Sequence, residues 1–513
     1  MNRLVLLNLI CHLLKRYHNI ENPNFNQVKE YYDSNLHPDV LDLNDEKVYK
    51  NIFHKGKFMG IFQFTNDGAQ KFCKRAKPND IIDIAAITSI YRPGPLSAGV
   101  DKQYVKNKRN PDDVYYPHKI VREVTEETAG FLIFQEQIAL LAHELGRDIS
   151  LDDANKLRKL LTKKGTGKGA EEKQKIEHKF TVGCMEKGID RDTAEYLWQT
   201  FEYFSGYGFN KSHAVSYSIL SFQCAWLLNY YPECWAAAFL DKEPETRKEA
   251  AISLALKYGF NIENININTS TTQWEIDESG KTLIQPLSSI KGLGDKAIEQ
   301  IIMNRPFNTV EELLFSKEVV YSKLNKRGLD VLCRSGALDD LVDERFNGCK
   351  HFWMAAIQDR PKNSKKLREN IELYSPEKDF SKEEKIDYIT SLTGLFPFDL
   401  VLTKQIRGAI NRYKCPALGK FDRALGYAWF IPREIIPKKT KHGKPSKTTK
   451  NGKTFWKLKV IDDTSTTTII RCWGVKDTFP KPEINRPYVA KLSYNEDWGY
   501  STRSYMRDFK LLG

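Results

Sequence analysis

The sequence predicts a multidomain protein that is mainly α-helical and ends in a small β-barrel. Its 513 residues are too many for one compact core, so several domains are expected. The apolar pattern is helical from Leu4 to about Tyr32, and a mostly helical region continues to about residue 240. After Gly419, segments rich in Thr, Val, Ile and aromatic residues are separated by turn residues, which is typical of short strands in a barrel.

The composition is that of a globular protein without a membrane segment. Hydrophobic residues make up 41% of the chain, which argues against wholesale disorder. The longest apolar stretch, Leu4 to Leu14, is too short to span a bilayer. Lys15 and Arg16 follow this stretch, whereas a signal peptide has its basic residues in front. We therefore expect a cytoplasmic protein with a buried helix at this position.

Cysteine spacing argues against metal and disulfide sites, and the net charge favours a polyanionic partner. The nine cysteines are scattered, without a Cys-x-x-Cys pair or a histidine cluster, so neither a metal site nor a disulfide framework is expected. The formal net charge is +13, which favours a polyanionic partner because Lys and Arg displace counterions from phosphates. Charge alone leaves open that these residues form only a solvated surface.

Helix signals divide the chain further. Asn44 is expected to cap a helix from Glu46 to Phe53, residues 241–345 hold shorter helices around glycine turns, and residues 346–410 form a charged, solvated helical connector. Asp190 and Asp192 precede an apolar-periodic run. We interpret them as capping and first-turn residues rather than metal ligands.

A glycine-rich and aromatic turn precedes a long apolar helix. It runs Phe204-Ser-Gly-Tyr-Gly-Phe-Asn-Lys-Ser-His213. Free amides at a helix N-terminus, with Lys211 and His213 beside them, favour a phosphate. A simple N-cap by Asn210 or Ser212 explains the same residues equally well.

This turn resembles the signature of the C-family DNA polymerases, the bacterial DNA polymerase III alpha subunits. Three further motifs of that family occur in the same order: Gly60-Ile-Phe-Gln63, Arg92-Pro-Gly-Pro95 and Gly130-Phe-Leu-Ile-Phe-Gln-Glu-Gln137. The resemblance implies a finger domain that binds the incoming deoxynucleoside triphosphate.

A basic segment, Leu157-Arg-Lys-Leu-Leu-Thr-Lys-Lys164, follows these motifs. Its cations can converge on one polyanion from a helix, or form only a solvated basic face. In the family it resembles a triphosphate clamp, although Lys159 stands where the family has a second arginine and so lacks the bidentate fork. The residues then expected to contact or shape the site of the nucleotide are Arg158, Lys159, Lys163, Lys164, Tyr207, Asn210, Lys211 and His213.

Residues 290–302 have the helix-hairpin-helix pattern, in which a Gly-x-Gly turn and the next helix N-terminus grip a DNA phosphate without reading sequence. An ordinary helical turn is the alternative. Residues 324–338 resemble the companion hairpin of the family. The predicted DNA contacts here are Lys291, Gly292, Gly294, Lys296, Lys326 and Arg327.

Residues 433–459 contain ten Lys or Arg and a single acid, Glu434, next to aromatic strand residues. Such a basic hairpin suits single-stranded DNA, although a solvated charged loop is the alternative. The order of elements resembles the C-terminal OB domain of the family. Predicted contacts are Lys438, Lys439, Lys441, Lys453, Phe455 and Trp456.

The resemblance also assigns domains and partners. It implies a palm-edge segment (1–45), fingers (46–240), a tandem helix-hairpin-helix domain (241–345), a connector (346–410) and an OB-fold (411–513). In the family, palm carboxylates hold Mg²⁺ and perform the chemistry. We find no match for them, so we expect no catalytic residue here and predict a split polymerase, as a phage would encode, that is inactive without a palm-containing N-terminal fragment. Its other partners would be primer-template DNA, dNTP and possibly a sliding clamp, in the bacterial cytoplasm. The alternative is a non-catalytic DNA-binding or polymerase-accessory protein.

Overall fold

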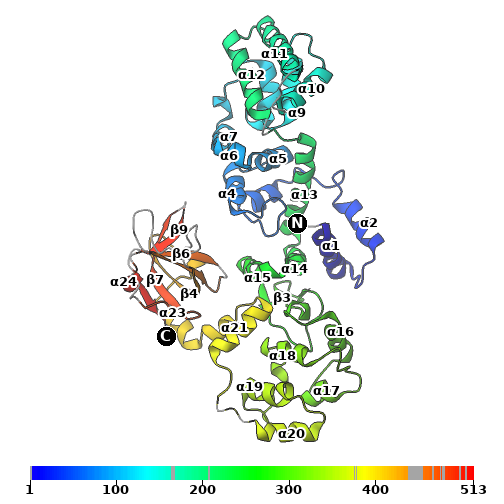
Figure 1. The fold of residues 1–513 in the computed structure, drawn as a ribbon, viewed down its shortest axis with the longest axis vertical. Coiled ribbons are helices and arrows are strands. Elements are labelled where there is room, and N and C mark those ends of the chain that lie inside the picture. Colours follow the sequence, from blue (N-terminus) through cyan, green and yellow to red (C-terminus); the bar gives the residue numbers. More distant parts are fainter. Residues whose placement is uncertain are drawn as a thin grey trace. The chain divides into compact units, whose positions relative to one another are not determined.

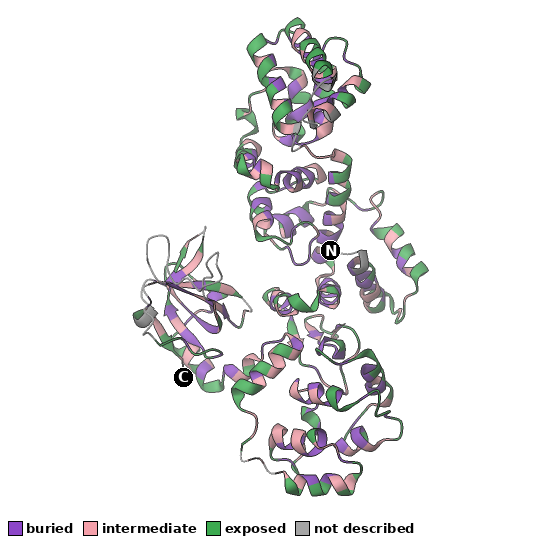
Figure 2. Ribbon diagram, viewed as in Figure 1, coloured by how far each residue is buried: buried purple, intermediate pink, exposed green. Residues whose placement is uncertain are grey.

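The chain folds into two units, Met1–Trp235 and Ala236–Gly513, in a computed structural model (Figure 1). The residues that it describes are 3–162, 168–205, 208–374, 376, 378–436, 455–464, 467–473, 475, 480–495, 498–502 and 505–512. Within each unit the buried residues line the inner faces of the helices and strands (Figure 2).

The first unit is helical throughout its described part. Its first half contains α1 (Arg3–His18), α2 (Phe25–Asn35), α3 (Glu46–Val48), the π-helical turn η1 (Tyr49–His54), α4 (Asp67–Ala76), α5 (Ile81–Ile90), α6 (Pro93–Ser97) and α7 (Val100–Arg109). The helix predicted from Glu46 to Phe53 is therefore present as α3 and η1. Its cap is Asp45 rather than Asn44, because the Asp45 carboxylate accepts from the Lys47 amide at 2.9 Å. The apolar helix α5 is buried because it packs against α13 (Lys211–Tyr230).

The second half of this unit is a subdomain with its own hydrophobic core. Its helices are α8 (Lys119–Thr125), α9 (Gln135–Leu145), α10 (Leu151–Thr162), α11 (Lys168–Glu186) and α12 (Arg191–Ser205), and the short turns η2 (Pro111–Asp113) and η3 (Glu126–Thr128) precede and follow α8. Phe180, Trp198 and Phe201 pack together at the centre.

Two short-range features fix the packing of this subdomain. Helix α11 approaches the end of α9 so closely that a Cβ on Gly183 would lie 2.3 Å from the Arg147 backbone nitrogen. Asp190 accepts hydrogen bonds from the backbone and hydroxyl of Thr193 at 2.9 and 2.7 Å. The interpretation of Asp190 as a cap of α12 is confirmed.

The second unit begins with α14 (Pro232–Lys242), which spans the boundary, and continues through short helices and a three-stranded sheet of order β1-β3-β2. These elements are η4 (Glu245–Arg247), α15 (Lys248–Lys257), β1 (Asn261–Glu263), β2 (Glu275–Ile276), β3 (Thr282–Ile284), η5 (Leu287–Ser289), α16 (Asp295–Asn304), α17 (Val310–Phe315), α18 (Lys326–Arg334), η6 (Asp339–Leu341), α19 (Gly348–Phe352), η7 (Trp353–Gln358) and α20 (Ser364–Leu373).

The core of this region extends beyond residue 345, where the sequence predicted a solvated connector to begin. Phe352, Ile357 and Leu367 are buried in the same core as Leu293 and Leu329. The high charge of this stretch led to the prediction of a solvated connector, which is wrong for these residues. Its apolar residues recur at helical spacing and pack inward. The remaining helices of the stretch and the turn that follows it are α21 (Lys382–Thr393), α22 (Phe398–Val401), α23 (Lys404–Arg412) and η8 (Leu418–Lys420).

The C-terminal part is strand-rich, and its strands are β4 (Tyr427–Ile436), β5 (Phe455–Ile461), β6 (Thr468–Trp473), β7 (Tyr488–Lys491), β8 (Ser493–Asn495), β9 (Gly499–Thr502) and β10 (Phe509–Leu511), with α24 (Tyr505–Asp508) before the last. Their order is β10-β7-β4-β5-β6-β9-β8, and only Leu492 separates β7 from β8. Because β7 continues through Leu492 into β8 near the other end of this order, the sheet curls into a small barrel, in which β6 and β9 are parallel. The predicted fold class, mainly α with a C-terminal barrel, is confirmed.

No helix in the described ranges has both the length and the apolar character needed to cross a bilayer.

Candidate nucleotide and DNA interface

Two motifs distant in sequence pair next to the N-terminus of α13. The Gln135 amide donates to the Phe209 carbonyl at 2.9 Å, and the Phe209 amide donates to the Ile133 carbonyl at 3.0 Å. The Gln135 side chain adds a bond to the Gly208 carbonyl at 2.9 Å. These bonds fix the glycine-rich turn against the first turn of α9.

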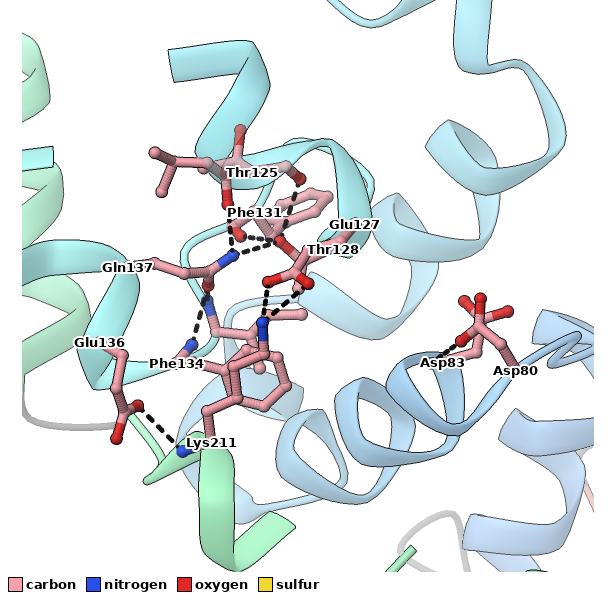
Figure 3. Close-up of polar contacts among 12 residues, drawn as sticks. Asp80, Asp83, Thr125, Glu127, Thr128, Phe131, Phe134, Glu136, Gln137 and Lys211 are labelled. Carbon is pink, nitrogen blue, oxygen red and sulfur yellow. Dashed lines mark hydrogen bonds and ion pairs between the residues drawn. The ribbon is translucent and has the colours of Figure 1, made fainter. Parts of the chain in front are cut away.

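Glu136 occupies the N-terminus of α13. Its carboxylate accepts from the Lys211 backbone amide at 2.9 Å (Figure 3). It also accepts from the Asn210 side-chain amide at 2.7 Å. Asn210 in turn caps the helix, because its Oδ1 accepts from the His213 amide at 2.9 Å. The sequence predicted that free amides at this helix N-terminus could bind a phosphate. The amides of Lys211 and His213 are instead hydrogen-bonded to the Glu136 and Asn210 side chains.

The Lys211 ammonium is paired with a second carboxylate. Its Nζ donates to both oxygens of Glu127 at 2.6 and 2.8 Å, and the two side chains are 33% and 35% exposed. An ion pair at this exposure is open to solvent and contributes little to stability. It can therefore be exchanged for a stronger anion at modest cost.

The loop that presents Glu127 is held by a buried glutamine. The Gln137 carbonyl oxygen accepts from the amides of Ile133 and Phe134, both at 2.9 Å, and its amide donates to the Val124 carbonyl and the Thr128 hydroxyl at 3.0 and 2.8 Å (Figure 3). Gln137 is 3% exposed. Its four bonds join α8, η3 and the start of α9 in one rigid frame.

The other two motifs meet the same turn through aromatic contacts. The Arg92 guanidinium lies 3.9 Å from the centre of the Phe209 ring, and partial burial lowers its pKa. The Tyr217 ring contacts Phe62 and His213 with centroid distances of 5.2 and 4.1 Å. All four sequence motifs therefore converge at the N-terminal end of α13.

The structure brings together three of the residues predicted for the nucleotide: Asn210, Lys211 and His213. Arg158 and Lys159 belong to α10, but their side chains lie outside the described part, as do the whole of Lys163, Lys164 and Tyr207. Sequence reasoning missed the two acids that bind the turn. Glu136 had a signal, since it lies inside a motif, whereas nothing near Glu127 in the sequence pointed to Lys211.

The carboxylates of Asp80 and Asp83 are not arranged as metal ligands. The pair Asp80 and Asp83 lies on α5 and its cap (Figure 3). Asp83 accepts from Lys108, from the Tyr104 hydroxyl at 3.1 Å and from the Asn79 amide at 2.8 Å. Among the residues described, no three or more His, Cys, Asp or Glu side chains group as metal ligands would.

The hairpin before α16 is exposed around one buried residue. Lys291, Gly292, Gly294 and Lys296 are exposed, whereas Leu293 is buried. Gly292 has φ +89°, a left-handed conformation that glycine adopts without strain. Within the described chain no side chain caps α16, so the Asp295 and Lys296 amides at its start lack a capping acceptor. This geometry suits a phosphate oxygen.

The companion hairpin lies next to the first. The Arg327 guanidinium is 3.8 Å from the position of a Cβ on Gly292. Asn325 caps α18 by accepting from the Gly328 amide at 3.1 Å. Lys326 donates to the Gln358 carbonyl at 2.6 Å, so of the two predicted cations Arg327 lies nearer the glycine turn.

The burial of β5 bears on two predicted DNA contacts. Trp456 is 5% exposed and belongs to the barrel core. Phe455 lies on the other face of the strand, because alternate residues of a strand face opposite sides, yet it too is only 8% exposed. Neither ring therefore presents a free surface on which a base could stack. The predicted contacts Lys438, Lys439, Lys441 and Lys453 lie outside the described residues.

On the face of β5 and β6 opposite the barrel core, partly exposed cations lie next to an aromatic pair. Phe455 pairs in register with Trp473, and their ring centroids are 4.8 Å apart. Next to them Lys457 pairs in register with Arg471. Sequence reasoning missed Arg471 and Trp473 because only strand pairing places them beside β5.

The comparisons with known proteins point to the same family in two places. Residues 21–185 match the bacterial DNA polymerase III alpha subunit finger domain, and residues 259–347 match a helix-hairpin-helix motif. The chain is 32% identical over 318 residues to the DNA polymerase III subunit alpha of Campylobacter jejuni, and 33% identical over 336 residues to that of Borreliella burgdorferi. These matches cover 61% and 64% of the chain but only 26% and 28% of the relatives, so the chain spans about a quarter of their length.

Proposed function

We propose that this chain, whose residues 21–185 match the finger domain of bacterial DNA polymerase III alpha subunits, supplies the fingers and DNA-binding domains of a replicative DNA polymerase. The observation that supports this most directly is the convergence of four motifs at the N-terminus of α13. Lys211 and His213 would there meet the triphosphate, together with Arg158, Lys159, Lys163 and Lys164 of the basic segment. The charge of a bound triphosphate would be neutralised and its position fixed.

The helix-hairpin-helix region and the barrel would hold the nucleic acid. The uncapped α16 and the exposed lysines beside it suit backbone phosphates, independent of base sequence. The face with Lys457, Arg471 and the partly exposed Trp473 suits single-stranded template, where cations meet phosphates and an aromatic ring stacks on a base.

The magnesium ions of the reaction belong, in this proposal, to a palm on another polypeptide. The pair Asp80 and Asp83 does not fit Mg²⁺, because the Asp83 carboxylate is already hydrogen-bonded by Lys108, Tyr104 and Asn79. The assembled enzyme would work in the bacterial cytoplasm. A sliding clamp stays a prediction.

A primer-extension assay tests this function. The purified chain is incubated with primer-template DNA, Mg²⁺ and dNTPs, alone and with a palm-containing N-terminal alpha-subunit fragment. We expect no extension by either polypeptide alone and extension by the mixture. DNA binding without extension in the mixture would instead identify a non-catalytic DNA-binding or accessory protein.

The hairpin gives a prediction for the chain by itself. Changing Lys291 and Lys296 to alanine removes two phosphate contacts, so the slope of log affinity against log salt for duplex DNA should flatten by about 1.8. Fluorescence anisotropy of labelled duplex over a salt series measures this slope. Lys326→Ala is the matched control, because the Lys326 ammonium is bound by the Gln358 carbonyl and should change the slope less.

A further inference from the structure

Helices α4 and α7 pack side by side in the first unit (Figure 1). The Arg75 guanidinium forms an ion pair with Asp101 at 3.0 Å, and the Arg109 guanidinium donates to the Arg75 carbonyl at 3.2 Å. These contacts fix the two helices relative to each other. Their exposed sides therefore form one surface, which we call the α4–α7 face.

The α4–α7 face is lined with cations. Positions on one side of a helix recur every three or four residues, and the exposed residues of α7 at this spacing are Lys102, Lys106 and Arg109. Helix α4 and its C-cap add Lys71, Lys74, Arg75 and Lys77, all exposed. None of the five lysines forms an ion pair with another residue of the described chain.

Acids of the same segment offset only part of this charge. From the start of α4 to the turn after α7, residues 67–113, there are nine Lys or Arg and six Asp. Asp83 is buried and bonded to Lys108, and buried Asp101 is paired with Arg75. Asp80 caps α5 by accepting from the Asp83 amide at 2.7 Å. The remaining acids, Asp67 at the start of α4 and Asp112 and Asp113 after α7, are exposed, but the seven exposed cations of the face outnumber them, so a net positive charge remains.

Polar amides accompany the cations and no large apolar side chain does. Gln103 is exposed on α7 between Lys102 and Lys106. The exposed large hydrophobic residues nearest in sequence are Val40 and Tyr115, so residues 41–114 present none. A membrane-binding helix would need an apolar face to insert, and a hot spot for a protein partner would need aromatic anchors. Phosphate groups need neither.

We propose that the α4–α7 face binds the sugar-phosphate backbone of DNA, separately from the helix-hairpin-helix region and the barrel. From Lys102 to Arg109 the helix rises about 10 Å, enough to follow about three phosphates of one strand. This inference rests on the DNA binding proposed above and adds a further contact surface for the nucleic acid.

The test changes Lys102, Lys106 and Arg109 to alanine in the full chain and measures binding of labelled duplex DNA over a salt series. We expect the salt slope to flatten by about 2.7 and the affinity at low salt to fall about tenfold or more. Because Arg109 also bonds the Arg75 carbonyl, Lys102→Glu with Lys106→Glu is a second variant that leaves that contact intact. The matched control removes three exposed cations of the second unit, Lys362, Lys365 and Arg368.

Each outcome decides the inference. Flattening in both α7 variants and not in the control supports it, whereas an unchanged slope, or an equal loss in the control, overturns it. Polyglutamate at the same concentration of negative charge serves as a competitor for the wild-type face. If it displaced DNA as well as unlabelled DNA does, the face would be assigned to an acidic protein instead. The Lys291→Ala, Lys296→Ala variant distinguishes failure of this inference from failure of the proposed function. If it weakens DNA binding and the α7 variants do not, only this inference fails; if the wild-type chain binds no DNA, the proposed function fails.

Discussion

Lys211→Ala is expected to lower the affinity for an incoming dNTP about 10- to 100-fold, the range that loss of a hydrogen bond to a charged group gives. Glu127→Gln should act in the opposite direction and raise that affinity several-fold. In the structure Glu127 holds the Lys211 ammonium through two bonds of 2.6 and 2.8 Å, so a triphosphate must compete with this carboxylate. Titration of a fluorescent dNTP into the chain with primer-template DNA and Mg²⁺ measures both effects.

The test depends on the two variants changing dNTP affinity in opposite directions. Lys211→Arg keeps the charge and should lose less affinity than Lys211→Ala. Glu123→Gln removes one exposed charge from α8 and should leave affinity unchanged, because Glu123 pairs with Lys119 rather than with the turn. If Lys211→Ala and Glu127→Gln both reduced affinity to the same extent, the pair would serve only to hold the turn, and Lys211 would leave the list of nucleotide contacts.

The grouping of the site could be predicted from sequence to the extent that its residues lie in motifs. The four motifs meet at α13, and Glu136 lies inside one of them. Glu127 lies outside every motif and reaches Lys211 across 84 positions of sequence. Only the fold can bring such a pair together, since the charges of two exposed residues do not specify a partner.

The same limit explains the other differences between expectation and structure. The change from helical to strand-like periodicity was enough to predict the barrel, but not which of Phe455 and Trp456 faces its core, because two adjacent large aromatic residues fit either strand parity. The α4–α7 face was not predicted, because its cations are divided between two groups at least 25 positions apart in sequence, and neither group is unusual alone.

Gln137→Leu is expected to cause the largest loss of local stability in the first unit. Leucine fills a similar volume but pairs with none of the buried groups that Gln137 satisfies, the Ile133 and Phe134 amides and the Val124 carbonyl. Each buried polar group left unpaired costs about 1–3 kcal/mol, so a combined loss of about 3–5 kcal/mol is expected. Hydrogen exchange at the Ile133 and Phe134 amides should accelerate about 100-fold or more, because these amides would lose their only side-chain acceptor and the loop would open more often.

Gln135→Leu is the matched control for this change. Gln135 lies two residues earlier on the same helix, is half-buried, and donates a single side-chain bond to the Gly208 carbonyl. Its loss should cost about 1 kcal/mol and leave exchange at the Ile133 amide nearly unchanged. Gln137→Glu should fall between the two, since a carboxylate can still accept from both amides but cannot donate to the Val124 carbonyl. Equal exchange rates in wild type and Gln137→Leu would mean that the loop presenting Glu127 is held by the apolar core alone, so the frame around Lys211 would not depend on this glutamine.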